Sequence, residues 1–318
     1  MASESGPAGL LTVLRGSTRG ACLVPLLAIL ALGCSKKDAR QAPASAGAPA
    51  QSVYTVNYPL AYFAKRLAPE GVEVVFPAPP DVDPAFWKPT PDEIGQYQRA
   101  SLILLNGAGY ARWTRYATLP KSRVVVTAAG CRDAFLQTGE AVAHQHGPAG
   151  EHAHEGTAFT TWLDMRLARC QAGHVGDALD ALHTKREALD HDLTELDTRL
   201  RGAAKVWGER PVLASHPVYQ YLADAYGLHI ESMHFEPDQA LSPEDLQALD
   251  ALLARHPAKL MLWEAPPLPE TEELLRDRGI ATVVFDPAAQ PPPTGDFLTV
   301  MTGNAKRLAC ATGAEPCL

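Results

Sequence analysis

Several protein classes are excluded by what this chain of 318 residues lacks. Basic side chains are a minority, 28 Lys and Arg against 36 Asp and Glu, so the chain lacks the positive charge by which proteins bind nucleic-acid phosphates. Six cysteines in a chain of this length exclude a disulfide-stapled miniprotein. The hydrophobic content of 46% excludes a disordered chain, and the length is enough for two domains with their own cores.

Motifs of common enzymes are also missing. The sequence contains no G-x-S-x-G nucleophile elbow, no P-loop and no H-E-x-x-H zinc motif. Gly107-Ala108-Gly109 follows an apolar run but lacks the third glycine of a dinucleotide site, which is replaced by Arg112. No nucleophile and base can be paired from the sequence, so we predict a protein that is not an enzyme.

The N-terminus has the pattern of an export signal. The apolar run Ala21–Leu32 is too short to span a bilayer as an anchor, and it follows two arginines. Gly33-Cys34-Ser35 resembles a bacterial lipobox, which predicts residues 1–33 as signal peptide and Cys34 as the lipidated first residue. Residues 34–51, rich in Ala, Pro and Ser, are then a flexible tether in the periplasm. An ordinary cleaved signal and an uncleaved anchor are the alternatives.

Four cysteines remain in the mature chain after Cys34. Cys310 and Cys317 enclose a short C-terminal segment and are the easier pair to bridge, whereas a bond between Cys131 and Cys170 stays open. None of them has the C-x-x-C spacing of a zinc or redox site. We therefore expect structural disulfides.

Apolar runs alternate with amphipathic stretches along the mature chain. Stretches such as Pro59–Leu67, Pro91–Arg99 and Pro243–Arg255 predict helices between eight predicted strands: 52–57, 72–77, 101–105, 124–128, 212–215, 229–233, 259–263 and 282–285. This alternation predicts an α/β fold with two lobes, each with a mostly parallel four-stranded sheet. The predicted lobes are 52–162 and 206–318, joined across 163–205 by one long rigid helix with a cleft between them.

Four polar side chains follow the strands of the second lobe. They are His216, His234, Glu264 and Asp286. Ligands in α/β sheets bind beyond the carboxyl ends of the strands, and two imidazoles with two carboxylates suit zinc or manganese. Ordinary roles are the alternatives: a helix cap for His216, a loop position for His234, a Lys or Arg partner for Glu264, and a turn for Asp286.

A second group of possible ligands lies in a segment without periodicity, residues 139–156. Four of the eleven histidines occur there, His144, His146, His152 and His154. Such a loop can hold a divalent metal weakly, because the loop is ordered only when the ion binds. We interpret it as an auxiliary metal loop, with a solvated loop of no function as the alternative.

Six stretches of the mature chain occur in a distinctive order. They are Asn57-Tyr58-Pro59-Leu60, VDPAFWKPTPDEI (82–94), LLNGAGY (104–110), TTWLD (160–164), SHPVYQYLADAYGL (215–228) and FDP (285–287). In this order the chain resembles the zinc and manganese class of periplasmic solute-binding proteins, the capture subunits of metal-uptake ABC transporters. The resemblance implies two lobes, a divalent metal between them, and delivery to an ABC-type permease in the inner membrane by a monomer.

The resemblance also shows a changed metal site. His216 and Asp286 match the family's third and fourth ligands, but the first and second, both histidines, are Ala85 and Thr160 here. We favour a site rebuilt in the second lobe with His234 and Glu264, binding zinc or, as the alternative, manganese. Otherwise the chain is an accessory carrier that uses its histidine loop, a binder of a non-metal solute, or a metal-free interaction lipoprotein.

Overall fold

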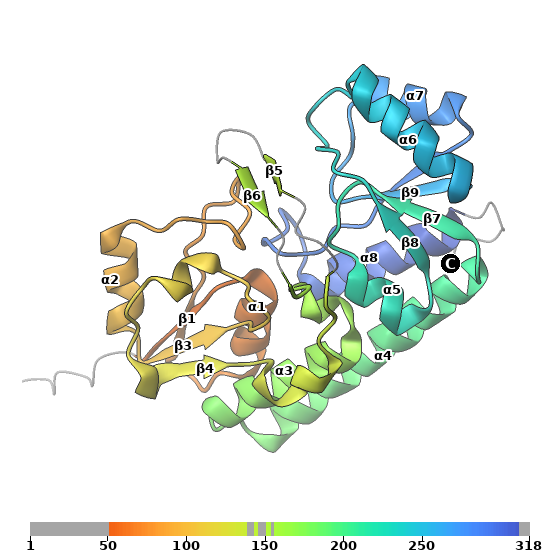
Figure 1. Cartoon of the computed structure of the whole chain (residues 1–318). Helices are drawn as coiled ribbons and strands as arrows, with labels where there is room; N and C mark the ends of the chain where they lie inside the picture. Colours follow the sequence, from red (N-terminus) through yellow and green to blue (C-terminus); the bar gives the residue numbers. More distant parts are fainter. Residues whose placement is uncertain (1–50, 139–142, 146–150, 154–155, 312–318) are drawn as a thin grey trace, which may run out of the picture. The chain divides into compact units, whose positions relative to one another are not determined.

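The computed structural model describes residues 51–138, 143–145, 151–153 and 156–311, which belong to one compact unit, Ala48–Leu318. It contains two four-stranded parallel sheets with helices packed around them (Figure 1). The predicted α/β class and all eight predicted strands are confirmed. Within the described residues, no helix is both long enough and apolar enough to span a bilayer.

The first sheet has the strand order β2-β1-β3-β4. Its strands are β1 (Ser52–Thr55), β2 (Glu73–Val75), β3 (Leu102–Leu105) and β4 (Val124–Val126). Helix α1 (Tyr58–Leu67) begins at Asn57, whose side chain accepts a hydrogen bond from the Leu60 amide, and α2 (Pro91–Arg99) begins with a capping box between Thr90 and Glu93. Short 3-10 turns complete this lobe: η1 (Arg112–Arg115), η2 (Lys121–Arg123), η3 (Ala129–Ala134) and η5 (Thr161–Leu163).

The second sheet has the order β10-β9-β7-β8, so β7 and β9 are its central strands. The strands are β7 (Pro211–Ala214), β8 (His229–Ser232), β9 (Leu260–Trp263) and β10 (Ala281–Val284). Every residue of β9 is buried, as expected for a central parallel strand covered on both faces. The helices of this lobe are α5 (Gln220–Tyr226), α6 (Pro243–Arg255), α7 (Pro269–Asp277) and α8 (Phe297–Cys310).

The connection between the lobes differs from the prediction of one helix. It consists of two helices, α3 (Met165–Ala178) and α4 (His183–Trp207). The break falls at Asp180, whose φ of 48° is left-handed, and the Ala181 amide donates back to the Gly176 carbonyl. The sequence gives little warning, because aspartate enters this region at small cost and no proline or glycine marks the turn. Helix α4 alone carries the buried leucine stripe and packs against both α3 and α8.

The histidine loop is not wholly irregular. Strands β5 (Ala143–Gln145) and β6 (Glu151–Ala153) form an antiparallel pair in which His144 and His152 are register partners. His146 and His154 lie outside the described residues, as do Cys34 and Cys317. The Cys310–Cys317 bridge and the lipidation of Cys34 therefore stay predictions.

Candidate metal centre

The carboxyl ends of the four strands in the second sheet lie side by side. Hydrogen bonds continue the parallel ladder past the strands themselves: the Ser215 amide donates to the Leu262 carbonyl, Phe235 to Ser215, and Phe285 to Trp263, each at 2.8 Å. The residues that follow the strands are thereby held along one edge. We call His216, His234, Glu264 and Asp286 the strand-end donors.

His216 lies at the centre of this edge and is only 3% exposed. Its Nδ1 atom lies 3.7 Å from Oε1 of Glu264, which follows the adjacent strand β9. Its Nε2 atom lies 3.9 Å from Oε1 of Glu236, beyond the other neighbour β8. The rings of His216 and His234 meet edge to face, with centroids 5.7 Å apart. Two carboxylates and a second imidazole thus surround one buried imidazole.

The spacing of the two imidazoles is close to that of a zinc site. Tetrahedral zinc with bonds of about 2.0–2.1 Å to nitrogen places two ring centroids about 5 Å apart. The strand-end donors are not yet close enough together to bind one ion. Among the described residues, the only group with three donor atoms within 4.8 Å of one another is Cys131, Cys170 and His174. Binding an ion at His216 therefore requires small side-chain movements.

The surroundings of Glu264 strongly raise the pKa of its carboxyl group. A third of its side chain is exposed, yet desolvation by the surrounding protein, then the negative charges of Asp83, Glu236 and Asp286, raise its pKa to about 8. Its carboxyl group lies 3.7 Å from the imidazole of His216, and not against the Lys or Arg that we considered as the alternative. A divalent cation would relieve this repulsion, because its positive charge would offset the negative charges of the three neighbouring carboxylates and so favour ionised Glu264.

Asp286 lies one strand further along the edge, beyond Glu264. Its Oδ1 accepts a hydrogen bond of 2.7 Å from the Ala288 amide, so the turn role considered for it is present. Asn304 of α8 fixes the backbone on both sides, accepting from the Asp286 amide and donating to its carbonyl. Burial raises the pKa of Asp286. At about 4.8 Å between neighbouring strands, Asp286 starts about 10 Å from His216, and Glu264 lies between them.

Two acidic residues near the site are absent from the predicted ligand set. Glu236 follows β8 by only a few positions, so the same strand-end argument that found His234 could have found it. Asp83, in the first lobe, raises the pKa of Glu264 from across the lobe junction. Its Oδ1 accepts from the Ala85 amide. Sequence reasoning had no signal for this proximity, because it depends on how the lobes pack.

The two positions at which the resemblance implies histidines, Ala85 and Thr160, are both buried. Ala85 is 2% exposed and adds no donor. Thr160 is buried, and its hydroxyl donates to the Val218 carbonyl at 2.5 Å, two residues beyond His216. Aromatic rings form the adjacent wall of the first lobe: Phe159 contacts both Phe86 and Tyr110 edge to face. This wall offers no metal ligand of its own.

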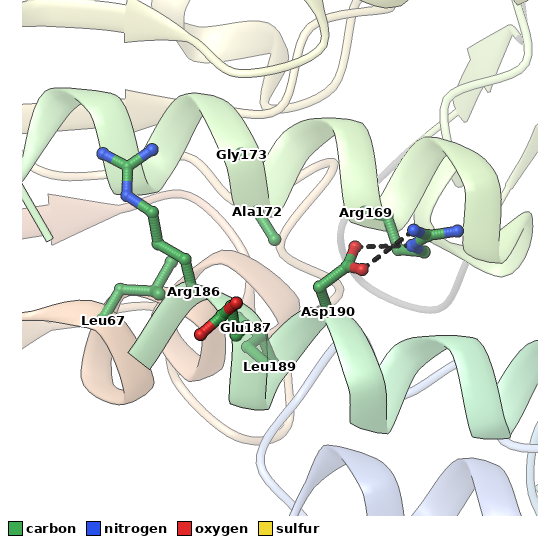
Figure 2. Close-up of a pocket in the computed structure, with 8 residues that line it drawn as sticks. All are labelled: Leu67, Arg169, Ala172, Gly173, Arg186, Glu187, Leu189 and Asp190. Carbon is green, nitrogen blue, oxygen red and sulfur yellow. Dashed lines mark hydrogen bonds and ion pairs between the residues drawn. The ribbon is translucent and has the colours of Figure 1, made fainter. Parts of the chain in front are cut away.

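A cavity of about 280 Å³ lies elsewhere, between α3, α4 and the end of α1 (Figure 2). Two arginines line it, but each is paired: Arg169 makes two hydrogen bonds to Asp190, and Arg186 bonds Asp177. With its cations neutralised by carboxylates, the cavity has no surplus charge to attract an anion. It contributes nothing to the strand-end donors.

Comparison with known families decides what kind of protein carries this site. The model of the zinc-uptake complex component A, periplasmic (ZnuA), matches residues 53–311. The chain belongs to this family. Members of the ZnuA family are solute-binding proteins of zinc transport, not enzymes, which confirms the family resemblance and the prediction of a non-enzyme.

Individual relatives are distant. The high-affinity zinc uptake system protein ZnuA of Bacillus subtilis is 25% identical over 232 residues, which are 67% of this chain and 70% of that protein. The metal-dependent lipoprotein YcdH of Bacillus subtilis has a TM-score of 0.66 and 22% identity, covering 81% of this chain and 98% of its own. Zn(II)-bound AdcA of Streptococcus pneumoniae has a TM-score of 0.69 and 19% identity, covering 83% and 58%. These structures share the fold.

The raised pKa of Glu264 predicts how the metal-free ZnuA-family chain responds to pH. Between the ordinary value of 4.5 and about 8 the folded state binds more protons at Glu264 than the unfolded state, so the free energy of unfolding falls as pH rises through this range. Glu264→Gln removes this loss. We expect the melting temperature of the variant, relative to the parent in chelator, to rise steadily from pH 5 to pH 8.

The matched control is Glu273→Gln, whose carboxylate is 70% exposed on α7 and pairs with Arg276 and not with a histidine. For that variant, we expect the difference in melting temperature from the parent to stay constant with pH. A Glu264→Gln curve that runs parallel to the parent across the whole range would contradict the protonated state assigned to Glu264.

Proposed function

We propose that this chain is a lipid-anchored extracytoplasmic receptor that binds one zinc ion at the strand-end donors and delivers it to an ABC permease. His216 carries the proposal, because it is buried and lies within 4 Å of carboxylates from two neighbouring strands. Carboxyl groups from two strands approach this buried imidazole beside the His234 ring, and burying their charge is costly without a proton or a cation to balance it.

Zinc is favoured over manganese by the ligand types. His216 and His234 supply two nitrogen donors, which suit zinc, whereas manganese prefers sites dominated by oxygen. Solved relatives include proteins bound to either metal: AdcA with Zn(II) and FpvC of Pseudomonas aeruginosa with Mn²⁺. In this chain Glu264 and Asp286 would complete the site, with Glu236 as a further carboxylate within reach of His216.

Anchoring and delivery rest on the family and on the N-terminal sequence. Proteins of the ZnuA type work with an ABC permease, and the Gly33-Cys34 junction supplies the site for a lipid. A monomer on a tether of residues 34–51 would stay close to the membrane in which the permease lies.

A second candidate function is an accessory carrier that holds metal through the histidine loop. The pairing of His144 with His152 across β5 and β6 supports it, because an antiparallel register places these two residues opposite each other. The absence of histidine at positions 85 and 160, where the resemblance implies two metal ligands, also favours this carrier. The same absence favours a receptor for a non-metal solute.

Uptake of radioactive zinc by bacterial cells distinguishes these functions. In cells without a functional copy of this protein, we expect the parent chain to restore zinc uptake, and the His216→Ala chain at equal abundance to leave it near the background. A chain without residues 143–155 should still restore uptake. Full uptake by His216→Ala together with none by the shortened chain would overturn the receptor and support the carrier.

A further inference from the structure

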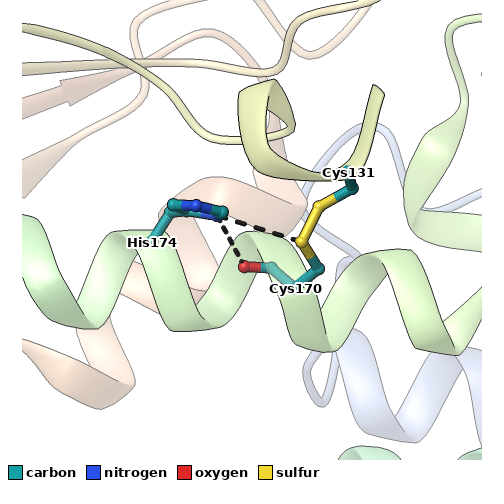
Figure 3. Close-up of side chains that lie close together, drawn as sticks. All are labelled: Cys131, Cys170 and His174. Carbon is teal, nitrogen blue, oxygen red and sulfur yellow. Dashed lines mark hydrogen bonds between the residues drawn. A yellow bond between two sulfur atoms is a disulfide. The ribbon is translucent and has the colours of Figure 1, made fainter. Parts of the chain in front are cut away.

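A second group of metal-ligating side chains lies far from the strand-end donors in sequence. Cys131 of η3 and Cys170 of α3 form a disulfide, and His174 lies one helical turn beyond Cys170 (Figure 3). Both sulfurs and a ring nitrogen of His174 lie within 4.8 Å of one another. The bond confirms that Cys131 and Cys170 can pair, which the sequence left open.

The geometry of these three residues fits a tetrahedral ion once the disulfide is open. Zinc with bonds of about 2.3 Å to sulfur and about 2.0–2.1 Å to nitrogen separates such ligands by about 3.6–3.8 Å. Nδ1 of His174 lies 3.9 Å from Sγ of Cys170. Cys170 and His174 are four residues apart, so they project from the same face of α3 and can share one ion.

The histidine is held beside the sulfurs. Its Nδ1 lies 3.0 Å from the carbonyl oxygen of Cys170, a hydrogen bond that fixes the ring beside the sulfurs and that Nδ1 would exchange for the metal on binding an ion. The ring also packs against the backbone of Gly130, where a Cβ atom would come within 2.5 Å of it. A structural disulfide requires neither the imidazole nor the glycine that makes room for it.

We propose that Cys131, Cys170 and His174 form a redox-gated zinc site, available when the disulfide is reduced and closed when it is oxidised. A dithiol reductant supplies two electrons and two protons: the bond between the two sulfurs breaks, two thiols form, and the reductant closes to its own disulfide. Zinc then displaces the two thiol protons and binds two thiolates and one imidazole, leaving a fourth position for water.

All three side chains are partly exposed, so an ion in solution can reach them without opening the core. The donors come from η3, directly after β4, and from α3, which packs against the first sheet. A zinc ion here would join the same two elements as the disulfide does. Oxidation by a two-electron acceptor would therefore release zinc while the link between η3 and α3 is kept.

Cobalt(II) titration of the full chain after reduction with a phosphine tests this site, because thiolate ligands give cobalt a charge-transfer absorbance. We expect reduction to add one equivalent of bound cobalt with this absorbance. Zinc should displace it. His174→Ala should weaken the binding of the additional ion at least about tenfold, as loss of a ligand or its support does. Cys131→Ser should abolish the thiolate absorbance of this ion.

Two controls separate the site from the other thiols. His183→Ala removes an exposed histidine at the start of α4, and a chain with Cys310→Ser and Cys317→Ser removes the C-terminal pair. Both should keep the additional ion. No additional cobalt on reduction, or equal binding by the parent and His174→Ala whether or not circular dichroism shows them folded, would overturn the proposal.

Discussion

His216→Ala is expected to lower the affinity of the chain for zinc by about a hundredfold or more. Changes to residues that merely support metal ligands typically cost ten- to a hundredfold, and His216 is the imidazole around which the other donors are arranged. Removing it also leaves Glu264 and Glu236 facing each other without the group between them. Competitive titration against a chromophoric zinc chelator measures the loss.

His191→Ala is the matched control for this experiment. His191 also lies within 4 Å of a glutamate, Glu195, but its side chain is 71% exposed on α4. It should leave zinc affinity within twofold of the parent, roughly the error of such a titration. Equal affinities for the parent and His216→Ala would rule out the strand-end donors as the zinc site.

Trp162→Phe is expected to weaken both the fold and the metal site. Trp162 is fully buried, and its indole nitrogen donates a 2.7 Å hydrogen bond to the Pro287 carbonyl, directly after Asp286. Phenylalanine keeps most of the ring but leaves that carbonyl without its donor, a loss of about 1–3 kcal/mol in the free energy of unfolding. Because the bond fixes the segment carrying Asp286 to the first lobe, zinc affinity should fall about tenfold.

Trp207→Phe separates stability from metal binding. Trp207 is also buried, and its indole nitrogen donates to the Leu308 carbonyl at 2.8 Å, between α4 and α8. We expect a similar loss in urea unfolding, about 1–3 kcal/mol, with zinc affinity unchanged. If the two variants lose zinc affinity equally, Trp162 acts through general stability, and the link from the first lobe to Asp286 has no special role.

Much of the fold could be predicted from the alternation of apolar runs with helical stretches. The sequence marks Pro91–Arg99 and Pro243–Arg255 correctly to the residue, because a serine or threonine cap and a proline precede the amphipathic pattern of each. The break at Asp180 was missed. A left-handed aspartate between two good helical patterns leaves the periodicity almost intact.

The sequence could predict those residues of the candidate site that directly follow the parallel strands of the second sheet. His216 and Glu264 follow adjacent central strands, and the structure places them within 4 Å. Asp83 could not be found this way, since its effect on Glu264 depends on the packing of one lobe against the other. The surroundings of Thr160 could not be predicted either. The sequence shows that the residue at this position is not a histidine, but only the structure shows its hydrogen bond to the Val218 carbonyl.

A zinc titration of the chain from which residues 143–155 are deleted tests the central claim most directly. Without the histidine loop, the strand-end donors and the cluster at His174 are the imidazole sites described above. Under oxidising conditions the latter is closed by its disulfide. We expect one tight zinc ion per chain, lost when His216→Ala is added. No tight zinc in the shortened chain, or one tight ion that His216→Ala leaves in place, would contradict the proposed centre.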